Sequence, residues 1–294
     1  MTKKISLYLM GYKGLTVLQH LSKNNLIQSI ELIKSSRDNN LQEDFYEDIA
    51  DLSKSLGLKF FDINDICSIQ TEFTLAVSWR WMINSFNNKL IVFHDSILPK
   101  YRGFAPLVSS LIKGEKYIGV SVFWATEKFD EGDIIAQKVQ EVTYPIKIID
   151  AIMQISELYG NLACEVVNAI NNNTKLPINK QDTAKATYSL WLDHEDYRID
   201  WNNDSHYIKR FIDSVGYPYL SAFTTVADDK IRVIDSEIVE DIAIENRKPG
   251  KVLRIENGEP VVVCGNGLIK IKKAIFEETK KTFLPLKILR TRFY

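Results

Sequence analysis

The chain has 294 residues, of which 45% are hydrophobic and 26% are charged, and its formal net charge is −1. This length suits two domains, and the near-neutral charge excludes a global field that would attract nucleic acid or an anionic membrane. The three cysteines form no CxxC pair, so they indicate neither a disulfide framework nor a zinc site. With no signal-peptide pattern and no apolar stretch of membrane-span length, we expect a soluble, cytoplasmic protein.

The first half of the chain alternates predicted strands with predicted helices. A helical repeat of apolar residues follows Gly14, and a second one from Phe45 to Leu56 is predicted to end at Gly57. The predicted strands are 4–10, 27–33, 58–61, 73–79 and 89–94. This alternation predicts an α/β fold with a doubly wound, mostly parallel, Rossmann-like sheet. The strand ends at Met10, Ser78 and His94 should then point at one ligand crevice.

The second half changes its pattern after a polar segment. Strands are predicted at 117–125 and 132–140, followed by a long amphipathic helix over 149–170. The polar, proline-containing segment 171–182 is interpreted as a linker. After a helix over 205–215, short strands separated by turns predict a small OB-like β domain. We therefore expect two domains, 1–182 and 183–294.

Two residues stand out as candidates for chemistry. His94 ends a buried strand and precedes a run of turn-forming residues, and Asp130 lies in the turn "EKFDEGDII". A single histidine is usually structural, and an acidic-glycine turn is usually only a turn. The loop that carries Asp130 could nevertheless reach the crevice of His94, and a histidine with a carboxylate can move a proton near neutral pH. The pattern alone leaves both interpretations open.

The stretch "FHDSILPKYRGFAPL", followed by "FDEGDII", resembles the folate-dependent formyltransferases, which include methionyl-tRNA formyltransferase and the amino-sugar N-formyltransferases. The family motif is Asn-x-His, a Ser-Leu-Leu-Pro-x-Tyr-Arg-Gly-like loop, and an aspartate in an Asp-x-Gly-Asp turn. The loop residues that match are Ser96, Leu98, Pro99, Tyr101, Arg102, Gly103, Ala105 and Pro106. The segment "SLWLDHEDYRIDW" and the strands after it look like the family's C-terminal OB-like domain.

The resemblance implies that 10-formyltetrahydrofolate is the formyl donor and that His94 and Asp130 are catalytic. His94 would hydrogen-bond the developing oxyanion and help remove the proton of the attacking amine, while Asp130 would orient the imidazole. The residues that correspond to the folate site are Ser78, Trp79, Arg80, Trp81, Met82, Thr126 and Lys128. The family's asparagine falls on Val92, which has no donor, so we expect His94, a backbone N–H or water to supply that contact.

The acceptor amine is inferred from charge and from the segment "SLWLDHEDYRIDW", which looks more like the amino-sugar N-formyltransferases than the tRNA-directed members of the family. From Tyr188 to Tyr294 there are 17 lysines and arginines against 17 aspartates and glutamates, so the region lacks the positive excess that tRNA binding usually needs. We therefore expect a deoxyaminosugar linked to a nucleoside diphosphate (dTDP or UDP), no nucleic-acid partner and no membrane partner. Such products enter surface polysaccharides such as O-antigen. The expected substrate-binding residues are Tyr12, Lys13, Tyr101, Arg102 and Trp191.

Two alternatives remain open at this stage. The first is methionyl-tRNA formyltransferase, which has the same chemistry and a different acceptor. The second is a folate-binding relative with weak or hydrolytic activity, which the loss of the asparagine at Val92 suggests. No metal site is expected, and the C-terminal β domain could supply a homodimer surface.

Overall fold

The computed structural model describes residues 4–67, 69–83 and 89–294, and it divides into two compact units. The first unit comprises Met1–Leu107, Lys116–Val142 and Asp150–Leu190. The second comprises Val108–Glu115, Thr143–Ile149 and Trp191–Tyr294. The division therefore follows Leu190, whereas the sequence led us to expect it after residue 182. The segment 171–182, interpreted as a linker, belongs to the first unit.

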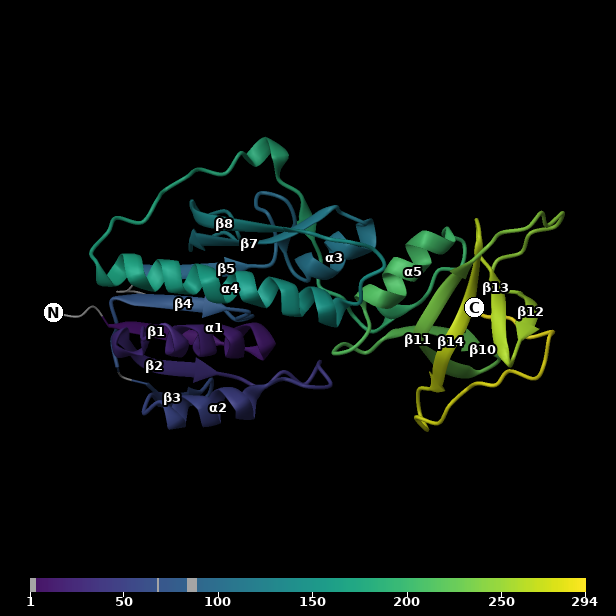
Figure 1. Ribbon diagram of the computed structural model, residues 1–294, viewed down its shortest axis with the longest axis horizontal. Helices are drawn as coiled ribbons and strands as arrows, with labels where there is room; N and C mark the ends of the chain where they lie inside the picture. The colour runs from purple at the N-terminus through teal and green to yellow at the C-terminus, as the bar shows by residue number, and fades with distance from the viewer. Residues whose placement is uncertain (1–3, 68, 84–88) are drawn as a thin grey trace. The chain divides into compact units, whose positions relative to one another are not determined.

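One mixed sheet organises the first unit, and the structure confirms the predicted fold class. Within the described residues the sheet has seven strands in the order β3-β2-β1-β4-β5-β7-β8. Its strands are β1 (Ile5–Leu9), β2 (Ile30–Ser35), β3 (Lys59–Asp62), β4 (Phe73–Val77), β5 (Lys89–His94), β7 (Tyr117–Trp124) and β8 (Ile134–Glu141). The pairs from β3 to β5 are parallel, and β7 and β8 are added antiparallel. Figure 1 shows the strands side by side, with α1 (Gly11–Lys23) and α4 (Ile148–Asn171) drawn in front of the sheet.

The helix α2 (Tyr46–Ser55) lies in the chain between β2 and β3, and α3 (Pro106–Lys113) follows the loop after β5. Gly57 has φ +70° and follows the end of α2, as the sequence predicts. The strand predicted at 27–33 instead begins at Ile30, after a 3₁₀ turn over Ile27–Ser29. The reason is the sheet register, because Ile30 is the first residue that pairs with β1.

The order in which strands are added to the sheet reverses between β1 and β4, although the two strands are parallel. From β1 the chain runs outward through β2 to β3, and it then returns to β4 on the other side of β1. Open α/β sheets bind ligands at such a switch point, outside the carboxyl ends of the strands. The parallel register places Leu9 beside Val77 and Val77 beside Phe93, so β1, β4 and β5 end at one edge of the sheet.

A small antiparallel sheet organises the second unit, as predicted for the C-terminal β domain. In the described chain it has five strands in the order β10-β11-β14-β13-β12. They are β10 (Ala222–Val226), β11 (Asp229–Val239), β12 (Val252–Glu256), β13 (Glu259–Val263) and β14 (Leu268–Phe276). The helix α5 (Ser205–Ser214) is capped by the Asp204 carboxylate, which accepts a hydrogen bond from the Tyr207 N–H at 2.8 Å. No helix in the described residues combines the length and apolarity that crossing a bilayer requires.

Candidate active site

His94 is the last residue of β5, and its imidazole is held by the loop that follows. Its Nε2 lies 2.8 Å from the carbonyl oxygen of Tyr101. A carbonyl oxygen only accepts hydrogen bonds, so Nε2 carries a proton. In the neutral imidazole, Nδ1 is therefore the nitrogen with a free electron pair. Tyr101 has φ +59°, and this left-handed backbone belongs to the turn that brings its carbonyl to His94.

The structure brings Asp130 to His94. The Nδ1 atom of His94 and the Oδ2 atom of Asp130 are 3.7 Å apart, and the two side chains are 9% and 14% exposed. The same Oδ2 accepts a hydrogen bond of 2.7 Å from the N–H of Gly103. The separation of Nδ1 and Oδ2 is too long for a direct hydrogen bond, so both atoms keep capacity for a ligand. The hydrogen bond between Gly103 and Asp130 thus joins the loop after His94 to the turn that carries Asp130.

The turn that carries Asp130 needs an unusual backbone. Asp130 itself has φ +54°, which is uncommon for a residue with a side chain. A Cβ atom at Gly132 would lie 1.6 Å from the carbonyl oxygen of Trp124, so only glycine fits there. The turn therefore packs tightly against the end of β7, and this fixes the position of the carboxylate.

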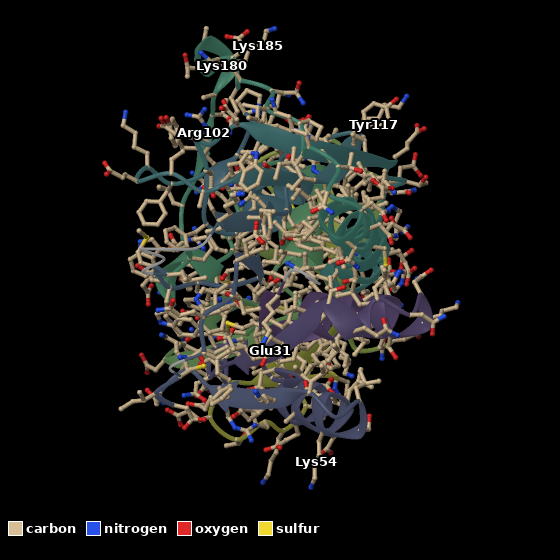
Figure 2. All side chains as sticks on the ribbon, turned by 90° about the vertical axis from the view of Figure 1, so that its left-hand side faces the viewer. Glu31, Lys54, Arg102, Tyr117, Lys180 and Lys185 are labelled. Atoms are coloured by element: carbon tan, nitrogen blue, oxygen red, sulfur yellow. The ribbon has the colours of Figure 1, made fainter. Side chains whose placement is uncertain are left out.

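Arg102 was expected to contact the substrate, but its guanidinium is used inside the protein. The residue is 2% exposed. Its Nη2 donates to Oε1 of Gln181 at 2.9 Å, and its Nη1 lies 3.3 Å from Oε1 of Glu131. In Figure 2, Arg102 lies below the turn that carries Lys180 and Lys185. The buried guanidinium is therefore paired within the protein, and its partner Glu131 is the residue that follows Asp130.

Three residues that the sequence did not single out hold these loops in place. Gln181 and Thr187 come from the segment after α4, and Ser189 belongs to β9 (Tyr188–Ser189), which pairs with β6 (Arg102–Gly103). The Oγ1 atom of Thr187 accepts a hydrogen bond of 2.9 Å from the N–H of Tyr101, and the Ser189 carbonyl accepts one of 3.1 Å from Phe104. Polar segments without periodicity give no signal for such contacts, so the sequence could not have shown them.

A charged network lies behind the imidazole. The carboxylate of Asp95, the residue after His94, receives hydrogen bonds from the ammonium of Lys13 and from the hydroxyl of Tyr159 on α4. Lys13, expected to bind substrate, is only 14% exposed and donates to this carboxylate. Burial would raise the pKa of Asp95, but the Lys13 ammonium and the Tyr159 hydroxyl outweigh it and lower that pKa. Burial, followed by the nearby Asp95 charge, raises the pKa of Tyr159 well above its ordinary value.

Ser78 and Trp79 lie at the switch point, immediately after β4. Ser78 has φ +54°, which ends the strand two residues earlier than the sequence predicts. Because Val77 pairs with Phe93, Ser78 follows β4 at the level of His94. The Ser78 Oγ and Trp79 Nε1 atoms are buried and have no hydrogen-bond partner among the described residues. Buried polar atoms without partners are rare in native proteins and suit contacts with a ligand.

Matches to protein families fall on both units. Residues 72–156, which include His94 and Asp130, match the family described as formyl transferase. Residues 192–287 match the formyl transferase C-terminal domain. The chain belongs to the formyl transferase family. The two matches together cover His94, Asp130 and most of the second unit.

Individual relatives of this formyl transferase differ in their acceptors. It is 28% identical over 214 residues to a methionyl-tRNA formyltransferase of Thermodesulfovibrio yellowstonii, an alignment that covers 71% of this chain and 67% of the relative. It is similar to the structure of the sugar 3N-formyl transferase WlaRD in the presence of dTDP and 5-N-formyl-THF (TM-score 0.70, 17% identity), covering 92% of this chain and 97% of that one.

A second similar structure is the N-formyltransferase of Helicobacter canadensis in complex with folinic acid and dTDP-3-aminofucose, with TM-score 0.68 and 15% identity over 92% of this chain and 99% of that one. At these identities the two structures establish the fold alone. The alignments with eight methionyl-tRNA formyltransferases span 53–67% of their lengths.

The remaining residues that the resemblance assigns to a folate site lie on two loops. The Nη1 atom of Arg80 donates to Oδ1 of the buried Asp38 at 3.0 Å. The ring of Trp79 packs edge-on against that of Trp81, with ring centroids 5.2 Å apart. The exposed fractions are 43% for Trp81 and 64% for Met82. On the second loop, the Thr126 hydroxyl donates to the carbonyl of Lys128, whose ammonium lies 3.8 Å from Glu131.

On the expected substrate side, Tyr12 packs edge-on against Phe45 with ring centroids 5.3 Å apart. Trp191 belongs to the second unit and is 63% exposed.

Val92, where this formyl transferase departs from the family motif, lies two residues before His94 on β5. Side chains alternate along a strand, so Val92 and His94 share one face of the sheet. Val92 pairs with Ala76 on one side and with Phe123 on the other. None of these three side chains has a hydrogen-bond donor. These three positions therefore do not supply the donor that the family motif has here.

Proposed function

We propose that this protein transfers the formyl group of 10-formyltetrahydrofolate to the amine of a deoxyaminosugar linked to dTDP or UDP. The observation that carries the proposal is the pair formed by His94 and Asp130. Tyr101 holds the proton on Nε2, so that Nδ1 faces the Asp130 carboxylate at 3.7 Å. An amine nitrogen that lies to one side of the line between these two atoms can donate one N–H to each of them.

The reaction needs one proton to move from the amine to the departing nitrogen. A C–N bond forms between the amine and the formyl carbon, and the C–N bond to the folate nitrogen breaks. His94 Nδ1 accepts the proton that the amine loses and returns it to the folate nitrogen. Asp130 stabilises the imidazolium that exists between these two transfers, as the aspartate of a catalytic triad does. Formyl donor and acceptor together account for all atoms, so no further reactant is required.

The residues at the switch point fit a folate. A pterin ring presents hydrogen-bond donors and acceptors along its edge and two apolar faces. Ser78 Oγ and Trp79 Nε1 offer a hydroxyl and an indole N–H without partners in the described chain, and Trp81 and Met82 offer exposed apolar surface. We propose that these four residues, together with Arg80, Thr126 and Lys128, hold the folate.

The Trp79→Phe variant is expected to bind 5-formyltetrahydrofolate about fivefold more weakly, because one hydrogen bond between uncharged groups contributes about 1 kcal/mol. The same change shrinks a ring that packs against Tyr8 and Trp81, so the free variant should unfold at a somewhat lower temperature. Titration calorimetry and thermal unfolding measure the two effects. Unchanged affinity would show that the indole N–H does not contact the folate.

The proposed sugar acceptor is supported by the charge pattern of the second unit. A run of lysines on β14, which includes Lys270, Lys272 and Lys273, is a candidate for a tRNA-binding face. Lys270 lies 3.5 Å from Glu237 and 3.3 Å from Glu256, and Lys272 lies 2.7 Å from Glu259. The hydrogen bond to Glu259 raises the pKa of Lys272. These glutamates reduce the positive potential that would attract phosphates along a tRNA.

A panel of dTDP- and UDP-linked 3-amino and 4-amino deoxysugars, incubated with the enzyme and 10-formyltetrahydrofolate, tests the acceptor. We expect mass spectrometry to detect at least one sugar that has gained a formyl group, and no formylation of methionyl initiator tRNA. The second candidate, methionyl-tRNA formyltransferase, is favoured by the names of the curated relatives. Formylation of the charged tRNA alone would establish that candidate, and release of tetrahydrofolate without any formylated amine would indicate a hydrolytic relative.

A further inference from the structure

Gln181 touches both loops of the proposed active site through a single side-chain amide. Its Nε2 donates two hydrogen bonds of 2.8 Å, one to the carbonyl of Asp130 and one to the carbonyl of Gly132. Its Oε1 accepts from Arg102 Nε at 3.2 Å and from Nη2 at 2.9 Å. The amide therefore uses both of its donors and accepts two hydrogen bonds.

We propose that Gln181 is a positioning residue that sets the Asp130 carboxylate against His94, an inference that rests on the proposed function. Its two donated hydrogen bonds hold the backbone carbonyls on either side of Glu131. One of these carbonyls belongs to Asp130, which has the left-handed conformation. The segment is itself anchored, because Asn179 and Ile134 exchange backbone hydrogen bonds of 2.7 and 3.0 Å. Gln181 thus ties the Asp130 turn to Arg102 and to β8.

The chemistry explains why glutamine is required at this position. Only an amide offers donors to two carbonyls and an acceptor to a guanidinium from one planar group. Glutamate could still accept from Arg102, but its carboxylate would face the carbonyl oxygens of Asp130 and Gly132 without a proton to donate. Gln181→Glu therefore removes the two bonds to the turn while it keeps the partner of the buried Arg102 charge.

The first test is kinetic and compares Gln181→Glu and Gln181→Ala with Asn179→Ala. The control removes an exposed amide from the same segment, and the backbone bridge to Ile134 remains. We expect kcat to fall by about 10–100-fold in both Gln181 variants, since a misplacement of about 1 Å can cost that much. KM for both substrates should change by less than about twofold, because the residue acts on geometry rather than on binding. Asn179→Ala should match the wild type.

The second test does not depend on the acceptor. The N–H of Gly103 donates to Asp130 Oδ2, so its hydrogen exchange reports whether the carboxylate is in place. Labelling with ¹⁵N-glycine limits the spectrum to the 13 glycines of the chain. We expect exchange at Gly103 to be at least about tenfold faster in both Gln181 variants and unchanged in Asn179→Ala.

The two tests together decide the inference. Faster exchange with a lower kcat supports it. Unchanged exchange overturns it, whatever happens to kcat, because the effect would then not pass through Asp130. Faster exchange with a wild-type kcat also overturns it. If no acceptor is formylated, the proposed function fails separately, and slow exchange at Gly103 in Gln181→Glu still refutes the role of Gln181. If Gln181→Ala does not fold, Gln181→Glu, which keeps the Arg102 contact, carries the test alone.

Discussion

Replacing His94 with alanine is expected to lower kcat for formyl transfer by about 10²–10⁴-fold, the range that general acid–base residues contribute. In the proposed mechanism, the imidazole accepts the proton of the attacking amine beside the Asp130 carboxylate. Its removal leaves the attacking amine without a base at the position of Nδ1. Folate affinity should change little, because Ser78 and Trp79, on the neighbouring strand end, are proposed to hold the folate. Kinetics with 10-formyltetrahydrofolate and the identified acceptor measure the effect.

Asp130→Asn should lower kcat over the same range. The asparagine Oδ1 can still accept from the Gly103 N–H, so the loops stay closed while the negative charge is lost. Glu127→Gln is the matched control, because it removes an equal charge from an exposed residue three positions earlier. We expect that control to retain wild-type kcat. Wild-type turnover in Asp130→Asn or in His94→Ala would refute the proposed roles.

Asp95→Ala is expected to lower the free energy of unfolding by about 3–5 kcal/mol, as breaking a buried ion pair does. The change leaves the Lys13 ammonium, which is 14% exposed, without its carboxylate partner, and the Tyr159 hydroxyl without its acceptor. The double variant Lys13→Met with Asp95→Leu should lose much less, because it removes both charges. Urea denaturation measures all three proteins, and equal losses in the single and double variants would contradict the pairing.

The same network predicts how stability depends on pH. The pKa of Asp95 is lowered in the folded protein, so its stabilising contribution is complete above the unfolded value and is lost as the pH falls through the folded value. The unfolded pKa of an aspartate is about 3.9. The stability difference between wild type and Asp95→Ala should therefore shrink below about pH 4 and stay constant from pH 5 to 8.

The sequence predicted those parts of the site that lie at the ends of regular elements. His94 ends a strand that is marked by three apolar residues, and the parallel order of β1, β4 and β5 brings Ser78 to the same edge. Asp130 was placed near His94 by the resemblance to a family motif, since a pattern of turn residues does not reveal where a long loop leads. The structure places the two side chains together.

The parts of the site that the sequence did not predict depend on contacts between segments that are distant in the sequence. Gln181 lies 51 residues after Asp130, in a polar stretch whose composition is that of a linker. Lys13 and Arg102 have the charge expected of a phosphate-binding residue, and burial beside an acceptor from another element directs each of them inward. Local patterns predict strands and helices, but they do not predict the partner of a long polar side chain.

We propose, above all, that the formyl group passes from the folate to the amine at the site formed by His94 and Asp130. A crystal structure with 5-formyltetrahydrofolate and the accepted nucleotide-linked sugar tests it most directly. We predict that the sugar amine and N10 of the folate, the atom that carries the formyl group in the donor, lie beside Nδ1 of His94 and Oδ2 of Asp130, and that the pterin contacts Ser78 and Trp79. A folate whose N10 lies too far from His94 and Asp130 for its formyl group to reach either side chain would contradict it.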